Sequence, residues 1–571
     1  MPKILRINLT AAKISYEELP DEYALWGNRG LIARYLLDEV PPTCHPLGEY
    51  NKLILATGPL AGSNVTSSAR LSAGAKSPLT GGIKESNAGG VAGRLLARLG
   101  LRALILEGRA KELSILKVGK EGAELIPAPE LKGLGNYDLA SRLLNKYGNK
   151  SGIISIGQAG EKLFPTAGIF VTDPAGSPSR ACGRGGLGAV MGSKNLKAVV
   201  IENNGNENLR PVNPDAYRRA VKEFHSAILQ HPQTSKAYPE YGTAGLLSTM
   251  NRLGGLPTRN FSSGSFEGAE KICGEALRAL ILDRGGEGRT THRCMDTCII
   301  RCSNIFPDPE GRALVSPLEY ETLVLLGSNI GVDNLDWIAK FNRLCNDFGI
   351  DTIEIGAAIG VAMEAGILNF GNARKVEELL KEVGEGTLLG RVIGQGAEIT
   401  GRVLGVTRVP TVKGQAMAAH EPRAIKGMTV TYATSPMGAD HTAGITVRAQ
   451  IDHRQPEGQM ELSRNTQVNV AAYDTLGFCI FVMPAVGGQP QLAVNILNAL
   501  YGTDYRDDFL RSLGKKVIRL EKAFNEAAGF TEAHDRLPEF FYSEKLPPYN
   551  VVSDIPAEDI KRFWDPDFWE E

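Results

Sequence analysis

The chain has 571 residues, with 63 lysines and arginines against 64 aspartates and glutamates, and its formal net charge is −1 at pH 7. This length predicts about three or four domains and enough chain for a large hydrophobic core. The balanced charge, without a basic stripe or tail, gives no support to a nucleic-acid partner. The 65 glycines exceed the roughly 7% average and predict backbone that passes close to a ligand.

The first ten residues alternate between apolar and polar as a strand does, and they lack the apolar core and cleavage site of a signal peptide. The most apolar helical window, 352–368, contains Glu354 and Glu364 and is too short to cross a bilayer. The eight cysteines form no disulfide framework, which fits a reducing compartment. We therefore expect a cytoplasmic protein without a membrane span.

Short apolar runs separated by glycine and proline predict a β-rich domain at 1–204. Strands are expected at 3–10, 13–19, 52–57, 69–76, 102–107, 114–118, 153–156, 169–172 and 198–202, with helices at 30–39, 92–99 and 139–147. Two glycine-rich connections, 77–90 and 179–195, can bring main-chain groups close to a large planar or phosphorylated ligand. Neither is a Walker A loop or a framed dinucleotide fingerprint. Ordinary turn glycines are the alternative interpretation.

A linker rich in Asn, Pro and Gly at 203–214 ends this domain. Helical periodicity then predicts a helical domain at 205–405 and a mostly helical domain at 406–571. Helices are expected at 214–230, 241–253, 275–282, 320–327, 335–348, 352–366, 375–383, 463–476, 491–501 and 507–528. The segment 419–441 looks irregular. The predicted fold class is α+β.

Three cysteines at four-residue spacing occur in Cys294-Met-Asp-Thr-Cys298-Ile-Ile-Arg-Cys302, and Cys479 lies far downstream. One curved loop can present three thiolates, and a fourth completes the ligands of a [4Fe–4S] cluster. The spacing lacks the paired half-sites of a structural zinc site. Buried cysteines on a core helix are one alternative. A radical-enzyme cluster is another, although its motif has a shorter second gap and no fourth cysteine.

Two glutamates and two histidines are candidate catalytic groups. Glu319 and Glu321 lie where a helix is expected to begin, and acids there can also simply complement the helix dipole. His420 and His441 lie in loops with proline or glycine on the way to the fourth cysteine, which favours them over the other histidines. Hydrogen bonding at the surface is the alternative role for such histidines.

Two distant segments share a sequence pattern. Cys345-Asn-Asp-Phe-Gly-Ile-Asp351 and Tyr473-Asp-Thr-Leu-Gly-Phe-Cys479 share a glycine at the end of an expected helix, where glycine can adopt the left-handed cap. Paired helix ends with acidic groups can grip two copies of one ligand. Two ordinary Schellman caps are the alternative.

Taken together, these motifs resemble the aldehyde ferredoxin oxidoreductase family of tungsten, sometimes molybdenum, bis-pyranopterin enzymes. The matching stretches follow one another over nearly the whole chain, at 8–9, 52–60, 76–81, 86–90, 183–198, 319–322 and 474–479. The resemblance implies a first domain of two β-sheets that forms a base for the cofactor. It also implies two mostly helical domains that close over this base.

The resemblance further implies that two pyranopterins hold one tungsten or molybdenum through their dithiolene sulfurs. A Mg²⁺ ion would join the two pterin phosphates and be held partly by the main-chain carbonyls of Asn87 and Ala181. Asp351 and Asp474 would accept hydrogen bonds from pterin ring nitrogens. Other cofactor contacts carry over as Arg70, Arg180, Gly183, Arg184, Asn346 and Gly477, where Asn346 stands at a position that is usually Asp. The cluster ligands carry over as Cys294, Cys298, Cys302 and Cys479.

Three departures from the family pattern suggest a side branch. Cys294 and Cys298 are separated by three residues, whereas the well-studied aldehyde oxidisers have a gap of two. Ala443 stands where a basic residue is common, and His420 replaces a frequent tyrosine. These differences weaken the expectation that the physiological substrate is a simple aldehyde.

The implied activity is oxidation of an aldehyde to a carboxylic acid with water as the oxygen source. Electrons would leave one at a time through the cluster to ferredoxin or a ferredoxin-like subunit. We expect Glu321 to be the general base, His441 to polarise the carbonyl and His420 to position the substrate. The catalytic subunit of a benzoyl-coenzyme A reductase and a cluster-only electron-transfer subunit are alternatives. A homodimer is compatible with each of them.

Overall fold

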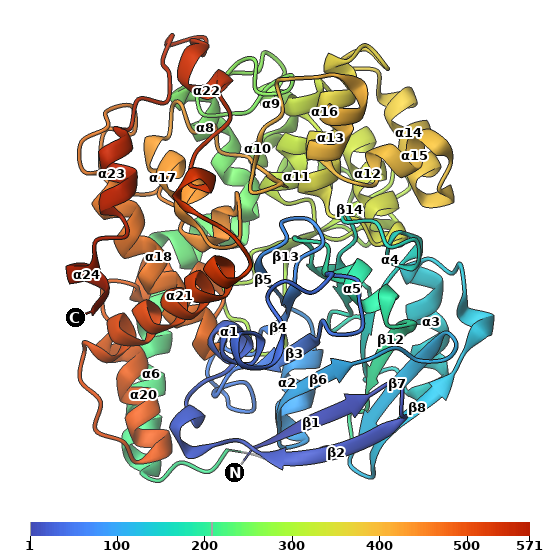
Figure 1. The fold of residues 1–571 in the computed structure, drawn as a ribbon, viewed down its shortest axis with the longest axis vertical. Coiled ribbons are helices and arrows are strands. Elements are labelled where there is room, and N and C mark those ends of the chain that lie inside the picture. The colour runs from blue at the N-terminus through green and yellow to red at the C-terminus, as the bar shows by residue number, and fades with distance from the viewer. Residues whose placement is uncertain (1, 207–208, 571) are drawn as a thin grey trace.

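A computed structural model describes residues 2–206 and 209–570 of the chain. Two β-sheets form one end of the molecule, and helices cover the other end and one side (Figure 1). The predicted α+β class is confirmed. The predicted linker, 203–214, includes residues 207 and 208, which lie outside the described part, as do the predicted domain ends at 1 and 571.

The first sheet has the strand order β2-β1-β6-β3-β4-β5, in which β1 and β6 run parallel and the other neighbours antiparallel. Helix α1 (Asn28–Glu39) packs on the face formed by β3, β4 and β5. Its strands are β1 (Lys3–Asn8), β2 (Lys13–Glu18), β3 (Leu53–Thr57), β4 (Leu71–Lys76), β5 (Ile83–Ala88) and β6 (Leu101–Glu107).

The second sheet has the order β11-β10-β9-β12-β7-β8, with β12 and β7 parallel. A shared core joins the two sheets, with Leu55 and Leu104 from the first meeting Leu116 and Val199 from the second. The elements are β7 (Ser114–Gly119), β8 (Gly122–Pro127), β9 (Gly152–Ser155), β10 (Ile169–Val171), β11 (Arg180–Cys182) and β12 (Leu196–Ile201), with α2 (Ala92–Arg98), α3 (Asn136–Tyr147), α4 (Gln158–Glu161) and α5 (Leu187–Ser193).

The prediction that 77–90 and 179–195 are connections throughout was wrong. The first contains β5 and the second contains β11 and α5. Both strands are the outermost strands of their sheets, and they lie in contact with each other. Their glycines flank the regular elements, so composition hid short strands that are held by ladder pairing with β4 and β10.

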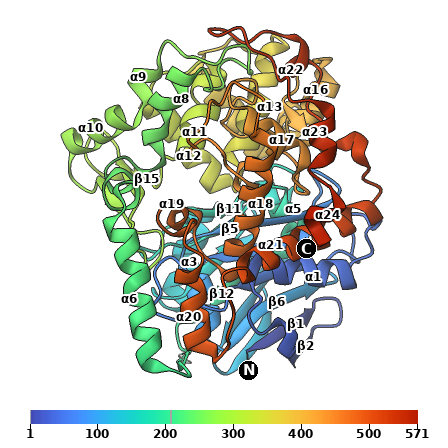
Figure 2. The same ribbon diagram turned by 90° about the vertical axis from the view of Figure 1, so that its left-hand side faces the viewer.

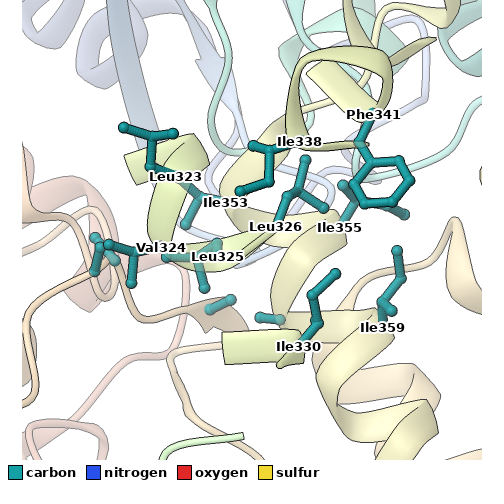
Figure 3. Packing of buried hydrophobic residues seen from close by; sticks show 14 of the residues in the cluster. Leu323, Val324, Leu325, Leu326, Ile330, Ile338, Phe341, Ile353, Ile355 and Ile359 are labelled. Carbon is teal, nitrogen blue, oxygen red and sulfur yellow. The ribbon is translucent and has the colours of Figure 1, made fainter. Parts of the chain in front are cut away.

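Much of the helical part is packed around one large apolar core, and residues 217–228 belong to a second core with the C-terminal helices. Residues of α11, α12 and α13 interlock in the large core, as Leu323, Ile338 and Ile355 show (Figure 3). Its elements are α6 (Pro214–Gln230), α7 (Tyr238–Tyr241), α8 (Leu247–Leu253), α9 (Ala269–Ile272), α10 (Gly274–Arg284), α11 (Tyr320–Leu325), α12 (Leu335–Phe348), α13 (Thr352–Glu364), α14 (Ala373–Glu385), α15 (Leu388–Ile393) and α16 (Ala397–Leu404), with β13 (Arg289–His292), β14 (Ser303–Pro307) and β15 (Ala313–Val315) as a small sheet.

The last part of the chain returns to the first sheet, because α18 and α21 both pack on α1. The segment 419–441, predicted to be irregular, contains α17 (Lys426–Thr434). All residues of α17 are buried, so the helix has no polar face and no amphipathic period to detect. The other elements are β16 (Thr411–Val412), β17 (Gln415–Ala416), α18 (Gln459–Leu476), α19 (Met483–Val486), α20 (Gln491–Tyr501), α21 (Phe509–Ala527), α22 (Phe540–Ser543), α23 (Ala557–Arg562) and α24 (Pro566–Glu570).

Among the described residues, no single helix is both long and apolar enough to cross a membrane. Helix α18 and the following segment Ile480–Val486 meet the length and composition requirement only as a pair, and they are bent by 119° at their junction. The division of the helical part at residue 405 stays a prediction.

Candidate functional site

The three closely spaced cysteines lie on a non-helical loop between β13 and β14, and Cys479 follows the end of α18. This excludes the interpretation that the three are core cysteines of a helix. All four thiols are free and at least partly buried. The thiols influence one another. A hydrogen bond from Cys294 lowers the pKa of Cys298 to about 6, and the charge on Cys298 adds to burial in raising the pKa of Cys302. Burial also raises the pKa of Cys479, where the charge on Cys298 acts in the same direction and Arg70 opposes it. Cys298 therefore lies close enough to the other three cysteines for their charges to interact.

Polar groups converge on these sulfurs. Ser67 Oγ lies 3.7 Å from Cys298 Sγ, and the backbone N–H of Arg301 lies 3.5 Å from the same atom. An added Cβ at Gly89 would come within 3.1 Å of Cys294 Sγ, so the backbone approaches this thiol closely. Among the described residues, no group of three or more His, Cys, Asp or Glu side chains is arranged to hold a metal ion. Cysteine thiols with hydrogen-bond donors to sulfur are nevertheless the ligand type of an iron–sulfur cluster, in which each thiolate binds a different iron.

Arg70 connects the thiols to the expected cofactor site. Its Nη1 lies 3.8 Å from Cys479 Sγ, and its Nη2 donates to the carbonyl oxygen of Asn87 at 2.9 Å. Its Nε also donates to the side-chain oxygen of Asn87. The Asn87 carbonyl, an expected Mg²⁺ ligand, thus already accepts one hydrogen bond and keeps its second lone pair.

The two expected Mg²⁺ carbonyls lie on the contacting edge strands of the two sheets. Asn87 is half-buried on β5 and Ala181 is on β11. Ala181 is exposed although Arg180 and Cys182 on either side of it are buried. An accessible residue between two buried ones shows that the sheet edges border open space.

Two buried guanidinium groups face this region with unused donors. Arg180 donates to Ser316 Oγ at 3.0 Å, and Arg184 donates to the carbonyls of Ala439 at 2.7 Å and Ala416 at 2.5 Å. The Nε atoms of both arginines have no hydrogen-bond partner. A buried donor without a partner is costly, and a phosphate is a ligand that satisfies it. Gly183 lies between the two arginines at the end of β11.

The two predicted helix ends are present, and each attaches to a different sheet. Gly349 after α12 and Gly477 after α18 both adopt the left-handed conformation, with φ of 76° and 81°. Gly349 accepts a hydrogen bond from Gly168 N at 3.0 Å, beside β10 of the second sheet. Gly477 accepts one from Arg70 N at 3.3 Å, beside β4 of the first sheet. This two-fold arrangement fits a pair of similar ligands.

The acidic residues of these helix ends have other partners as well. Asp351 caps α13 by accepting from Ile353 N at 3.0 Å, and Arg184 lies 3.5 Å away. Burial raises the pKa of Asp474 to about 7, although Arg29 lies 3.4 Å from its carboxylate. Asn346 donates to Tyr137 Oη at 3.3 Å. A hydrogen-bond donor on a ligand would stabilise the ionised form of Asp474 and so oppose the effect of burial on its pKa.

Glu321 and the two candidate histidines come together in space. Glu321 lies in the first turn of α11, and its Oε1 is 3.3 Å from Nε2 of both His420 and His441. Its Oε2 accepts from Ala419 N at 2.7 Å. Burial by itself would raise the pKa of Glu321, but the imidazoles and the amide outweigh burial and lower the pKa to about 2. Burial also lowers the pKa of His441.

The histidine rings keep one face of the site polar. Their centroids are 5.7 Å apart, and His420 stacks on Tyr320 at 5.4 Å. The Nδ1 atoms of both histidines are buried without a hydrogen-bond partner. Glu319 is the N-cap residue of α11, and its carboxylate accepts a hydrogen bond from Thr243 Oγ1. A substrate with polar oxygens fits the free Nδ1 atoms.

A buried ion pair next to His441 was missed from the sequence. Lys84 on β5 pairs with Asp440, and their side chains are 0% and 5% exposed. The other oxygen of Asp440 accepts from Thr442 N at 3.1 Å and lies 3.8 Å from His441 Nδ1. Lys84 lies in the segment 77–90, which was predicted to be a glycine-rich connection. The one indication in the sequence was that Asp440 directly precedes the candidate residue His441.

The two-sheet base lies next to a helical part that carries the cysteine loop and the Glu–His group. The family model "Aldehyde ferredoxin oxidoreductase, N-terminal domain" matches residues 4–203, and the model of domains 2 and 3 of that enzyme matches residues 219–563. The chain belongs to the aldehyde ferredoxin oxidoreductase family.

Curated relatives support this assignment. The chain is 30% identical to a tungsten-containing aldehyde ferredoxin oxidoreductase of Pyrococcus furiosus, over 95% of this chain and 92% of the relative, and 31% identical over the same shares to one of Thermococcus kodakarensis. It is 27% identical to a WOR-like subunit of an aliphatic sulfonate oxidoreductase of Pyrococcus furiosus, over 98% and 92%. A solved benzoyl-coenzyme A reductase complex, BamBC, shares the fold, with a TM-score of 0.81, 18% identity and coverage of 100% and 94%.

Proposed function

We propose that the chain is a tungsten-pterin oxidoreductase that oxidises an aldehyde to a carboxylic acid with water, with molybdenum as the alternative metal. Electrons leave singly through a [4Fe–4S] cluster to ferredoxin or a ferredoxin-like subunit. The observation that supports this proposal most strongly is that Glu321 Oε1 lies 3.3 Å from Nε2 of both His420 and His441. The relatives named as tungsten-containing aldehyde ferredoxin oxidoreductases support the substrate class.

The residues on the two sheet edges fit the proposed cofactor. Arg180, whose Nε has no hydrogen-bond partner, would donate to phosphate oxygens, and Arg184, whose Nε lies 3.5 Å from Asp351 Oδ2, would add a second positive charge. Asp474, whose pKa is raised to about 7, would accept from a ring N–H of one pterin, and Asp351 would do so for the other. Carbonyls of Asn87 and Ala181 would hold Mg²⁺. When bound, the metallopterin supplies two-electron chemistry and the cluster supplies one-electron steps.

The chain's own groups handle protons in this proposal. Glu321 is ionised at neutral pH, since its pKa is about 2, and it accepts a proton from the attacking water. That proton has a path of 3.3 Å to Nε2 of either histidine. Transfer of that proton to Nε2 while the water attacks makes His441 a cation, whose Nδ1–H stabilises the negative charge that develops on the carbonyl oxygen. His420, stacked on Tyr320, positions the substrate.

The replacement Glu321→Gln tests this role. Gln keeps the shape and removes the proton acceptor, so turnover with a dye acceptor should fall by about 10²- to 10⁴-fold. Tungsten, iron and magnesium contents should equal those of the wild type, because Glu321 touches none of the proposed cofactor contacts. Unchanged turnover across an aldehyde panel would remove Glu321 from the mechanism.

Assays and metal analysis of the same purified protein distinguish two alternative functions from the proposed one. A low-potential acyl-coenzyme A reductase would show dye-linked oxidation of a dienoyl-coenzyme A and no activity on the aldehyde panel. The BamBC likeness, at 18% identity, supports the fold alone. A cluster-only electron-transfer subunit would contain iron without tungsten or molybdenum. The buried Nε of Arg180, which has no hydrogen-bond partner, argues for a bound anion and against that third function.

A further inference from the structure

Five cations on neighbouring segments are exposed and form no ion pair among the described residues. Arg219 and Lys222 lie on α6, Lys236 lies on the segment Gln233–Ala237, and Arg293 and Arg301 flank the first and last cysteines of the loop. We call these five residues the cationic face. By contrast, the neighbouring Arg218 is paired with Asp215. The acidic residues on the same segments that remain unpaired are Glu223, Glu240 and Asp296.

The cationic face lies directly outside the thiol group. Thr66 joins the two, because its N–H donates to His225 Nε2 on α6 and its hydroxyl accepts from Ile299 N on the cysteine loop, both at 3.1 Å. Phe224 of α6 stacks on Phe478, the residue before the fourth cysteine, with ring centroids 5.2 Å apart. One layer of side chains therefore separates the outside of α6 from the proposed cluster.

The surface is hollowed at this place. A groove of about 710 Å³ lies between α6 and the segment from α19 to α20, elements that run together along one side of the molecule (Figure 2). Arg219, Lys222 and Glu223 line one wall, and Ala485, Gln489 and Leu492 line the other. The groove thus combines unpaired positive charge with apolar contact area, which a protein partner uses and a small dye does not need.

We propose that the cationic face and this groove dock a small iron–sulfur electron carrier with an acidic surface. The inference rests on the proposed function, which needs a one-electron acceptor. Uncompensated positive charge around an electron exit attracts a negatively charged partner and orients its approach. One electron passes from the reduced cluster to the oxidised cluster of the carrier, and no bond forms or breaks.

The test compares two acceptors with the complete holoenzyme. An acidic bacterial-type ferredoxin probes docking, and benzyl viologen, a small dye, reports on aldehyde oxidation alone. The variants are Arg219→Glu, Lys222→Glu and the double variant. Each reversal should raise KM for ferredoxin by roughly 3- to 10-fold, with dye-linked turnover unchanged. Added salt should raise the wild-type KM and should flatten the difference between wild type and variants.

Lys150→Glu is the matched control. Lys150 is exposed, lies between α3 and β9, and makes no ion pair in the described part of the chain, so it has the same charge change away from α6. Equal ferredoxin KM values for Lys222→Glu and Lys150→Glu would overturn the docking inference, as would a wild type that reduces the dye but not ferredoxin. A wild type that shows no dye-linked aldehyde oxidation would instead contradict the proposed function.

Discussion

Removing the negative charge of Asp440 should both destabilise the protein and displace His441. Asp440→Asn leaves the ammonium of Lys84 buried without its counter-charge, because the side chains of this pair are 0% and 5% exposed. Asp440 also lies near Arg184, whose positive charge helps to hold the pKa of Asp440 below its usual range. Breaking a buried pair by removing one partner costs about 3–5 kcal/mol.

The effect on catalysis follows from geometry. Asp440 caps the short turn His441–Ala443 by accepting from Thr442 N at 3.1 Å, and Lys84 fixes the same carboxylate to β5. A shift of about 1 Å in a catalytic group can cost about 10²-fold in rate. We therefore expect a loss of that order in dye-linked kcat, with tungsten and iron contents unchanged.

The assay is denaturant unfolding of wild type and variants, combined with steady-state kinetics. Asp38→Asn is the control, since Asp38 forms an exposed pair with Arg34, which is worth only about 0.3–0.5 kcal/mol. The double variant Lys84→Met and Asp440→Asn removes both charges and should recover most of the stability without recovering the activity. An Asp440→Asn variant that loses no more stability than Asp38→Asn would refute the reasoning.

Three further predictions concern other parts of the site. Gly477→Ala should destabilise by about 1 kcal/mol or more and lower the pterin content, because φ is 81° and a Cβ would meet Gly58 Cα at 3.0 Å; differential scanning calorimetry and metal analysis check this. Cys302→Ser should lower the iron content and abolish ferredoxin reduction. An iron assay and electron paramagnetic resonance check this, and a cluster signal that persists in the variant would contradict it. The lowered pKa of Glu321, about 2 against an ordinary 4.5, means that this carboxylate stabilises the fold above about pH 4.5 and ceases to do so as the pH falls toward 2. The stability difference between wild type and Glu321→Gln should therefore shrink on acidification, and a constant difference from pH 7 to pH 2 would contradict that assignment.

Local patterns were sufficient for many elements. The bounds of α6, α12 and α20 match the predicted ranges, because each has an apolar face at helical spacing and a residue that starts or ends it, such as Asn213 or Gly349. The glycine caps at Gly349 and Gly477 were likewise predictable, since a left-handed cap favours glycine for steric reasons alone.

Other elements depend on distant partners. Helix α17 is buried on all sides, so nothing in its sequence distinguishes an outer face. Strands β5 and β11 are three to six residues long and become regular only by pairing at sheet edges. The roles of the predicted site residues stay predictions, although the structure brings Glu321 together with His420 and His441 and places Arg70 beside Cys479.

The sequence by itself determined the fold class and the family, because these depend on residue types at fixed local spacing and on the order of the motifs along the chain. Only the tertiary structure decided that Lys84 neutralises Asp440 beside a catalytic candidate, that Arg70 reaches from Asn87 to Cys479, and that α6 lies over the thiols. Apart from Arg70 and Asn87, which are 17 positions apart, these contacts join residues that are hundreds of positions apart. Charge compensation and packing in a buried interior choose such partners, and no local pattern encodes them.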